Sequence, residues 1–245
     1  MPTRAPTAGA MMPHRIFQHG DFETLAEGVW LLRGTVPAPV HRNMVVVRLA
    51  SGALLLHSVI ALTDERMAAL GRLGRPAYAI VPSLHHMMDA PFYKTRFPDI
   101  TMLCPAPIRA TAAGRVTIDA TVEAVLATLG IRLHPVPATR SFEYVYDMPM
   151  PEGGRMLVFN DALGNRGAPT KGLLGFLFGK LLWVAGEGPD LSRLYRLTQS
   201  RDTAAIRRFA AGLGGIPDLR LVTFSHGDPL TENPGAALKR LGEKA

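Results

Sequence analysis

Metal-ligating side chains follow three predicted strands that lie far apart in the sequence. Two imidazoles and one carboxylate can hold a divalent cation and leave positions open for water and substrate. The candidate ligands are His85, His86 and Asp89 after the strand predicted at 77–81, Asp161 after 156–159, and His226 after 219–224. Sites in α/β proteins are usually built in loops at strand ends, so this shared position predicts that the fold brings the ligands together.

Each of these segments can also be explained without a ligand. The adjacent histidines can line a loop, and Asn160-Asp161 can cap the segment that follows it. Ser225-His226-Gly227 can be a tight turn in which the backbone needs a glycine. We therefore treat the metal site as one hypothesis, which requires the fold to bring the three segments together.

Predicted strands and helices are interspersed along the chain, which is typical of an α/β fold. Thr63 is predicted to cap a helix that ends at Gly71 or Gly74, and Asn233-Pro234 is predicted to begin the last helix. The other predicted helices cover 90–96, 121–129, 172–184, 191–197 and 202–212. The predicted strands cover 29–33, 44–49, 53–57, 77–81, 100–104, 131–136, 143–148, 156–159 and 219–224.

Length and composition indicate one domain with a well-filled core. The chain has 245 residues, of which 47% are hydrophobic, and we interpret 16–245 as a single domain after a flexible tail at 1–15. Cys104 is the only cysteine, so the sequence offers neither an intrachain disulfide nor a thiolate zinc cluster. This cysteine usage favours a reducing compartment, and we expect a cytoplasmic protein.

Charge and hydropathy limit the partners that we expect. The net charge is +7, but the basic residues are dispersed without aromatic interleaving, so no nucleic-acid partner is predicted. The apolar run 172–186 contains Lys180 and is shorter than the roughly 20 residues that cross a bilayer, so no transmembrane segment is predicted. This run is either a buried helix or a contact for a membrane surface or for a second copy in a homodimer.

Four phrases of the sequence are MVVVRLASGALLLHS, VPSLHHMMDAPFYKTRFPDI, MLVFNDALGN and VTFSHGDPL. Their order resembles the metallo-β-lactamase superfamily, in particular a divergent branch of it with a degenerate metal motif. The resemblance spans about residues 28 to 241 and implies an αββα sandwich, an α/β fold in which helices flank two mixed sheets.

The main metal motif of that superfamily is T-H-x-H-x-D-H, and this chain departs from it. With Ser83 at the threonine, the next motif positions hold Leu84, His86, Met88 and Asp89, so only the second histidine is kept. The superfamily's middle histidine, in a Gly-His-Thr turn, falls near 138–140, where no ligand stands.

Two other positions match the superfamily pattern. Asp161 corresponds to its bridging aspartate and His226 to its final histidine. The resemblance thus implies at most one cation, held by His86, Asp161 and His226, with Asp89 as a fourth ligand. Zinc, iron and manganese all suit this set, and a site without metal is the alternative.

Further residues could support the ligands without touching the cation. His57 stands where the superfamily often has an aspartate, and it either orients a ligand or is a core histidine. Arg140 and Glu143 could form a buried ion pair in the space left by the missing histidine, and His85 belongs to the same surrounding set.

The resemblance implies a metal-dependent hydrolase that acts on a small ester, lactone or thioester. The cation would activate a water molecule, which Asp161 or Asp89 would orient or deprotonate. A protein that keeps the fold without catalysis and binds a ligand, a partner or a membrane surface is the alternative. An iron enzyme that uses oxygen would need the same ligands.

Overall fold

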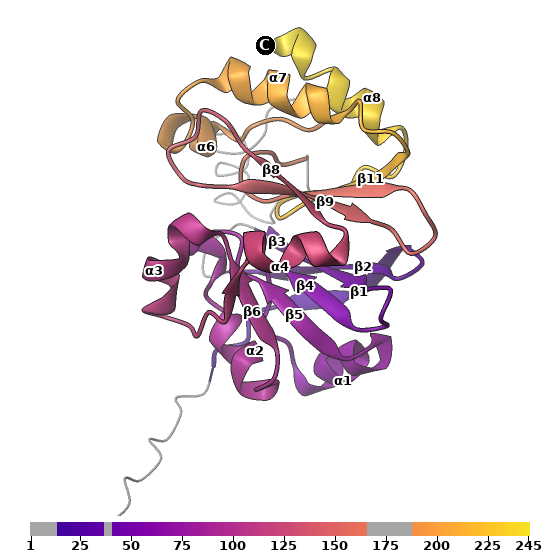
Figure 1. Cartoon of the computed structure of the whole chain (residues 1–245), viewed down its shortest axis with the longest axis vertical. Helices are drawn as coiled ribbons and strands as arrows, with labels where there is room; N and C mark the ends of the chain where they lie inside the picture. Colours follow the sequence, from indigo (N-terminus) through magenta and orange to yellow (C-terminus); the bar gives the residue numbers. More distant parts are fainter. Residues whose placement is uncertain (1–13, 37–40, 166–187) are drawn as a thin grey trace, which may run out of the picture.

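The computed structural model describes residues 14–36, 41–165 and 188–245. Two β-sheets pack face to face, and helices cover the outer face of each sheet (Figure 1). This is the predicted αββα sandwich. The predicted helix at 172–184, with the whole 172–186 run, and most of the predicted tail lie outside the described residues.

The first sheet has seven strands in the order β1-β2-β3-β4-β5-β6-β7. Strands β1 to β4 pair antiparallel, whereas β4 to β7 pair parallel. Its strands are β1 (His19–Ala26), β2 (Val29–Thr35), β3 (His41–Arg48), β4 (Leu54–His57), β5 (Pro76–Ile80), β6 (Thr101–Cys104) and β7 (Ala120–Thr121).

The second sheet has four strands in the order β11-β10-β9-β8. The pair β10–β11 is parallel, and the other two pairs are antiparallel. Its strands are β8 (Arg132–Pro135), β9 (Tyr144–Pro149), β10 (Arg155–Phe159) and β11 (Leu219–Phe224).

The core is divided into three layers because successive strand residues point to opposite faces. In β2, Leu32 packs towards the helices of the first sheet, whereas Leu31 packs between the sheets. The outer layer of the second sheet is formed by residues such as Leu157, Phe224 and Ile206. Strands buried on both faces explain the nearly continuous apolar runs in the sequence.

Helices α1, α2 and α3 cover the first sheet, and α6, α7 and α8 cover the second (Figure 1). Their bounds are α1 (Asp64–Leu73), α2 (Ala90–Arg96), α3 (Arg109–Ala113), α6 (Arg193–Thr198), α7 (Thr203–Leu213) and α8 (Pro234–Lys239). Shorter helical turns are α4 (Val122–Val125), η1 (Leu84–His86), η2 (Ala106–Ile108), η3 (Leu126–Leu129) and η4 (Gly242–Lys244).

Several local predictions differ from the structure. Strand β1 was not predicted, because it lies at the sheet edge and none of its residues is fully buried, so it lacks a clear apolar pattern. The predicted helix at 121–129 is divided into α4 and η3. Thr63 and Asn233 precede α1 and α8 as predicted, but neither side chain makes a capping hydrogen bond.

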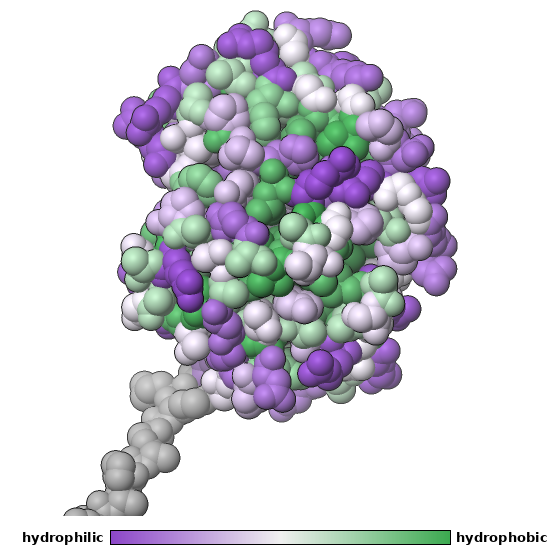
Figure 2. Space-filling view, viewed as in Figure 1, coloured by the Kyte–Doolittle hydropathy of each residue, from purple (hydrophilic) through white to green (hydrophobic). Residues whose placement is uncertain are grey.

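The surface agrees with the dispersed charge of the sequence. On the face shown in Figure 2, hydrophilic residues are scattered over both layers rather than gathered on one element. Within the described part of the chain, every helix is too short or too polar to cross a membrane.

Candidate metal centre

Three loops bring His86, Asp161 and His226 together. His86 ends the 3-10 turn η1 after β5 of the first sheet, whereas Asp161 and His226 follow β10 and β11 of the second sheet. One ligand atom from each residue lies within 4.8 Å of the others. The prediction that these three distant segments meet agrees with the structure, and the cluster joins the two sheets.

The distances between the candidate ligand atoms match those in a metal site. Oδ1 of Asp161 lies 3.0 Å from Nε2 of His86 and 3.2 Å from Nε2 of His226. The two imidazole rings are 5.1 Å apart and inclined at 67°. Ligands about 2.0 Å from a tetrahedral zinc ion lie roughly 3.3 Å from one another, so the donor set fits a single cation.

The tautomer of His226 follows from its other ring nitrogen. Nδ1 of His226 lies 2.7 Å from the carbonyl oxygen of His41 and must donate to it, because a carbonyl only accepts. In the neutral ring, Nε2 therefore carries a lone pair and faces Oδ1 of Asp161. Two lone pairs at this distance repel each other, so Nε2 and Oδ1 require a shared proton or a cation between them.

The turn after β11 needs the glycine that the sequence provides. Gly227 has φ +97°, and a Cβ atom there would lie 1.8 Å from the backbone oxygen of Asn165. The backbone N–H of Asn165 in turn donates to the carbonyl of His226. The tight turn at Gly227 therefore fixes the position of the His226 backbone.

A serine supports the imidazole of His86. Oγ of Ser58 lies 2.7 Å from Nδ1 of His86, and Ser58 is fully buried with φ +57°, a left-handed conformation that is rare for serine. Burial lowers the pKa of His86, and the negative charge of Asp161 opposes this shift. Burial therefore favours the neutral imidazole that binds metals.

The carboxylate of Asp161 is held in its ionised form. Burial alone would raise its pKa, but the charge of His86 and hydrogen bonds from both histidines hold the pKa of Asp161 well below its usual range. Its second oxygen, Oδ2, accepts hydrogen bonds from Asn160 at 2.9 Å and from Ser83 at 3.3 Å. An ionised carboxylate with one oxygen facing two imidazoles is suited to bind a cation.

Glu143 lies behind the Asp161 loop. Its carboxylate accepts a hydrogen bond from the backbone N–H of Ala162 at 2.9 Å and also from those of Asn160 and Asp161. Burial and the charge of Asp161 raise the pKa of Glu143 to about 8. Glu143 is buried while Arg140 is exposed, and no ion pair joins them, so the predicted buried pair is wrong.

Hydroxyl groups occupy the place where the resemblance puts the missing histidine. The hydroxyl of buried Tyr195 donates to Oγ1 of Thr139 at 3.0 Å, and Oγ1 also lies 3.3 Å from Oγ of Ser141. The backbone N–H of Arg140 donates to the carbonyl of Gln199 at 2.7 Å. The loop is anchored but offers no imidazole to a second cation.

Asp89 is not among the three grouped ligands. It is buried, and its carboxylate pairs with the guanidinium of Arg42 and with Nε2 of His14, the latter at 2.7 Å. His14 belongs to the predicted tail, so this end of the tail contacts the domain. His85 is exposed to solvent on η1.

His57 lies in the core beside the cluster. Its ring is fully buried against Tyr146 with 5.0 Å between ring centroids, and among the described residues neither ring nitrogen has a hydrogen-bond partner. Burial lowers the pKa of His57 to about 3. The adjacent Ser58, not His57, makes the hydrogen bond to a candidate ligand.

The sequence analysis did not find the residues that hold the candidate ligands. Ser58, His41, Arg42 and Asn43 contact the ligands or their loops. The polar residues at the start of β3 were a usable signal, because an arginine and an asparagine precede the apolar run 44–47 of a buried strand.

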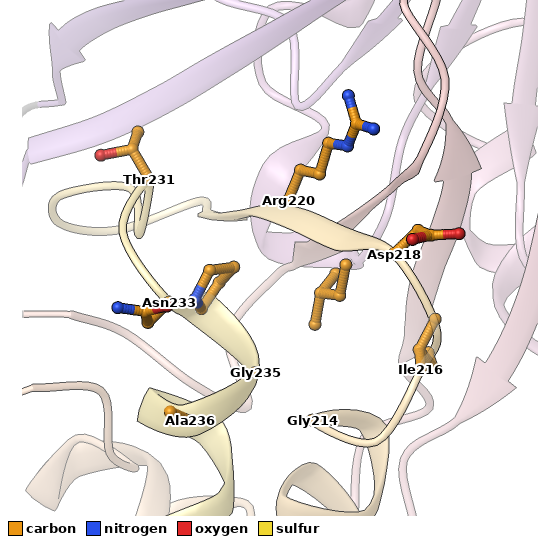
Figure 3. A pocket seen from close by; sticks show the side chains of 10 residues that line it. Gly214, Ile216, Asp218, Arg220, Thr231, Asn233, Gly235 and Ala236 are labelled. Carbon is orange, nitrogen blue, oxygen red and sulfur yellow. The ribbon is translucent and has the colours of Figure 1, made fainter.

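A shallow pocket of about 460 Å³ lies elsewhere, between the end of α7, β11 and the start of α8. The labelled side chains of Thr231, Arg220 and Asp218 point in different directions around it (Figure 3). They do not converge on a common point, so this pocket lacks the arrangement of a catalytic site.

Comparisons with known proteins give structural matches only. No protein-family model matches the chain, and no curated protein sequence matches it. A metallo-β-lactamase from Erythrobacter litoralis with β-mercaptoethanol in its active site matches with TM-score 0.58 and 19% identity, over 91% of this chain and 96% of that one.

Two further structures are similar over almost the same length. FIM-1 from Pseudomonas aeruginosa, in a mono-zinc form, has TM-score 0.56 and 15% identity over 95% of this chain and 97% of its own. DIM-1 exposed to ceftazidime has TM-score 0.58 and 14% identity over the same shares, 95% and 97%. The predicted resemblance is confirmed at the level of architecture: the chain has the metallo-β-lactamase fold.

Proposed function

We propose that this protein is a metal-dependent hydrolase that holds one divalent cation through His86, Asp161 and His226. The observation that carries the proposal is the convergence of two imidazole nitrogens on one carboxylate oxygen: Oδ1 of Asp161 lies 3.0 Å from Nε2 of His86 and 3.2 Å from Nε2 of His226. The His41 carbonyl holds the ring of His226 through Nδ1. The mono-zinc form of FIM-1 supports a single ion on this fold. Zinc, iron and manganese suit the ligands.

The proposed substrate is a small ester, lactone or thioester. When bound, the cation would lower the pKa of a water molecule and polarise the substrate carbonyl. Asp161 would orient that water by accepting a hydrogen bond, since its low pKa makes it a weak base. Asp89 is less suited to this role, because His14 and Arg42 already contact its oxygens.

A protein without catalysis is the second candidate, and one observation favours it. A proton shared by His226 and Asp161 would satisfy the same pair of atoms as a cation. The cluster would then be a buried ion pair supporting a ligand-binding or partner-binding protein. An oxygen-using iron enzyme would use the same ligands and differ in the identity of the metal.

Elemental analysis of protein purified without chelator or affinity metal tests the proposal. We expect about one equivalent of zinc, iron or manganese in the wild type, none in His226→Ala, and an unchanged content in His85→Ala. His85 is the matched control, because it is an exposed histidine beside His86. Metal-loaded wild type should then hydrolyse members of an ester, lactone and thioester panel. No metal in the wild type after reconstitution would exclude the hydrolase and favour the second candidate.

A further inference from the structure

Three consecutive residues at the start of β3 contact both histidine loops. We call His41, Arg42 and Asn43 the β3 clamp. The carbonyl of His41 accepts a hydrogen bond from His226, and Arg42 pairs with Asp89 on the His86 loop. The clamp therefore lies between two ligands that come from different sheets.

Arg42 and Asp89 form a buried ion pair. Arg42 is 3% exposed and Asp89 is 1% exposed, and Asp89 follows His86 by three residues at the start of α2. The pair fixes the end of the His86 loop to β3. Within the described part of the chain, the buried Nε of Arg42 has no hydrogen-bond partner, which costs free energy that an apolar residue at this position would not cost.

Asn43 holds the His226 loop on both sides of the ligand. Its side-chain Nδ2 donates to the carbonyls of Phe224 at 2.8 Å and Gly227 at 2.7 Å. Its backbone N–H donates to the carbonyl of Ser225 at 2.8 Å. With the bond from His226 to His41, the clamp contacts all four residues from 224 to 227.

We propose that the β3 clamp is the positioning element that sets His86 and His226 at the separation one cation requires. This inference rests on the proposed function for its role in metal binding. The contacts of the clamp do not depend on the proposed function. Each of the three clamp residues holds a candidate ligand or its loop, and none of them belongs to the group of candidate ligands. Groups that orient metal ligands in this way typically change metal affinity by about 10- to 100-fold when they are removed.

The first test is the double variant Arg42→Met/Asp89→Leu, which removes both charges of the buried ion pair together. Replacing both buried charges by apolar residues of similar size usually preserves stability, whereas removing one leaves the other unpaired. We expect an unchanged melting temperature and a zinc affinity lowered by about 10-fold or more in competition with a chromophoric chelator. The Co(II) absorption spectrum should change as well. Unchanged affinity and spectrum in a folded double variant would overturn the proposal.

His14→Ala is the matched control for this test. His14 contacts the same carboxylate from the outer side and is partly exposed, but it does not touch the β3 clamp or the ligands in the described structure. We expect its zinc affinity to equal that of the wild type. An equal loss in His14→Ala and in the double variant would assign the effect to Asp89 alone and overturn the role of Arg42.

The second test measures the effect of the clamp on the His226 side chain in metal-free protein, so its outcome does not depend on the proposed function. In the wild type, ¹⁵N NMR of the histidine side chains should show a hydrogen on Nδ1 of His226 that exchanges slowly with solvent, because it is bonded to the His41 carbonyl. Asn43→Ala should speed the exchange of this hydrogen. If the wild type binds no metal but this change occurs, the clamp stands and the hydrolase fails. If Asn43→Ala keeps the wild-type exchange rate, the clamp fails. The Asn43→Ala measurement also tests the clamp if the Arg42→Met/Asp89→Leu double variant does not fold.

Discussion

The His226 loop and the loop at 138–141 both occupy places where metallo-β-lactamase-like sequences are expected to carry a histidine. The first keeps its imidazole and is tied to β3 by Asn43 and by the His41 carbonyl. The second is tied to the segment after α6, where Thr139 pairs with Ser200 and the N–H of Arg140 bonds to Gln199. Both backbones are therefore held in place by long-range hydrogen bonds.

The difference between the two loops is confined to side-chain chemistry. Nitrogen donors converge on Asp161 from the His86 and His226 loops, whereas the 138–141 loop contributes hydroxyls that bond to Tyr195. Neutral hydroxyls are weak ligands for zinc compared with imidazole. The two loops are thus held in similar ways, but only the His226 loop offers an imidazole to the group of His86, Asp161 and His226.

Among the variants that test the difference between the two loops, Ser58→Ala is expected to have the largest effect, which is a loss of zinc affinity. This change removes the hydroxyl that lies 2.7 Å from Nδ1 of His86 without altering a candidate ligand. We expect zinc affinity to fall by about 10-fold or more, measured by chelator competition. Ser58→Gly removes the same hydroxyl but also relieves the positive φ. Wild-type affinity in both variants would show that the hydroxyl does not support His86.

Glu143 follows the 138–141 loop and accepts hydrogen bonds from the Asp161 loop, and its pKa predicts a pH-dependent stability. Its pKa is raised from 4.5 to about 8 in the fold, so the folded protein binds this proton more tightly than the unfolded chain does. The resulting stability is present at low pH and is lost as the pH rises from about 4.5 to about 8. In metal-free protein, Glu143→Gln should flatten the melting temperature across that window. A pH profile parallel to that of the wild type would contradict the raised pKa.

The smallest effect is expected from Tyr195→Phe in the hydroxyl cluster. The variant loses one hydrogen bond to Thr139 and should lower the free energy of unfolding by about 1 kcal/mol, measured by urea denaturation. Metal content should stay at the wild-type value, because Tyr195 is not among the grouped ligands. A loss of metal in Tyr195→Phe would instead show that the 138–141 loop contributes to the cation site.

Strand patterns, and the polar residues that follow the strands, were predictable from the sequence because they are local signals. The last strand was predicted with the bounds that β11 has, since its apolar run is bordered by clear turn residues. The meeting of His86, Asp161 and His226 followed from their shared position at strand ends.

The environment of each ligand was not predictable, because it depends on long-range partners. Asp89 has the side chain of a possible metal ligand, and only its contact with Arg42, 47 residues away in the sequence, shows that the clamp holds it. Likewise, nothing near Glu143 in the sequence shows that it accepts hydrogen bonds from the Asp161 loop. The edge strand β1 has no clear apolar pattern to detect.

The bonds from β3 to the loop after β11 join residues separated by 181 to 185 positions in the sequence. Closing such a long loop is entropically costly, so contacts of this kind usually form late in folding. His226 follows β11, which is the last strand of the second sheet in chain order. During synthesis, a growing chain therefore cannot bring His86, Asp161 and His226 together until all four strands of that sheet have left the ribosome.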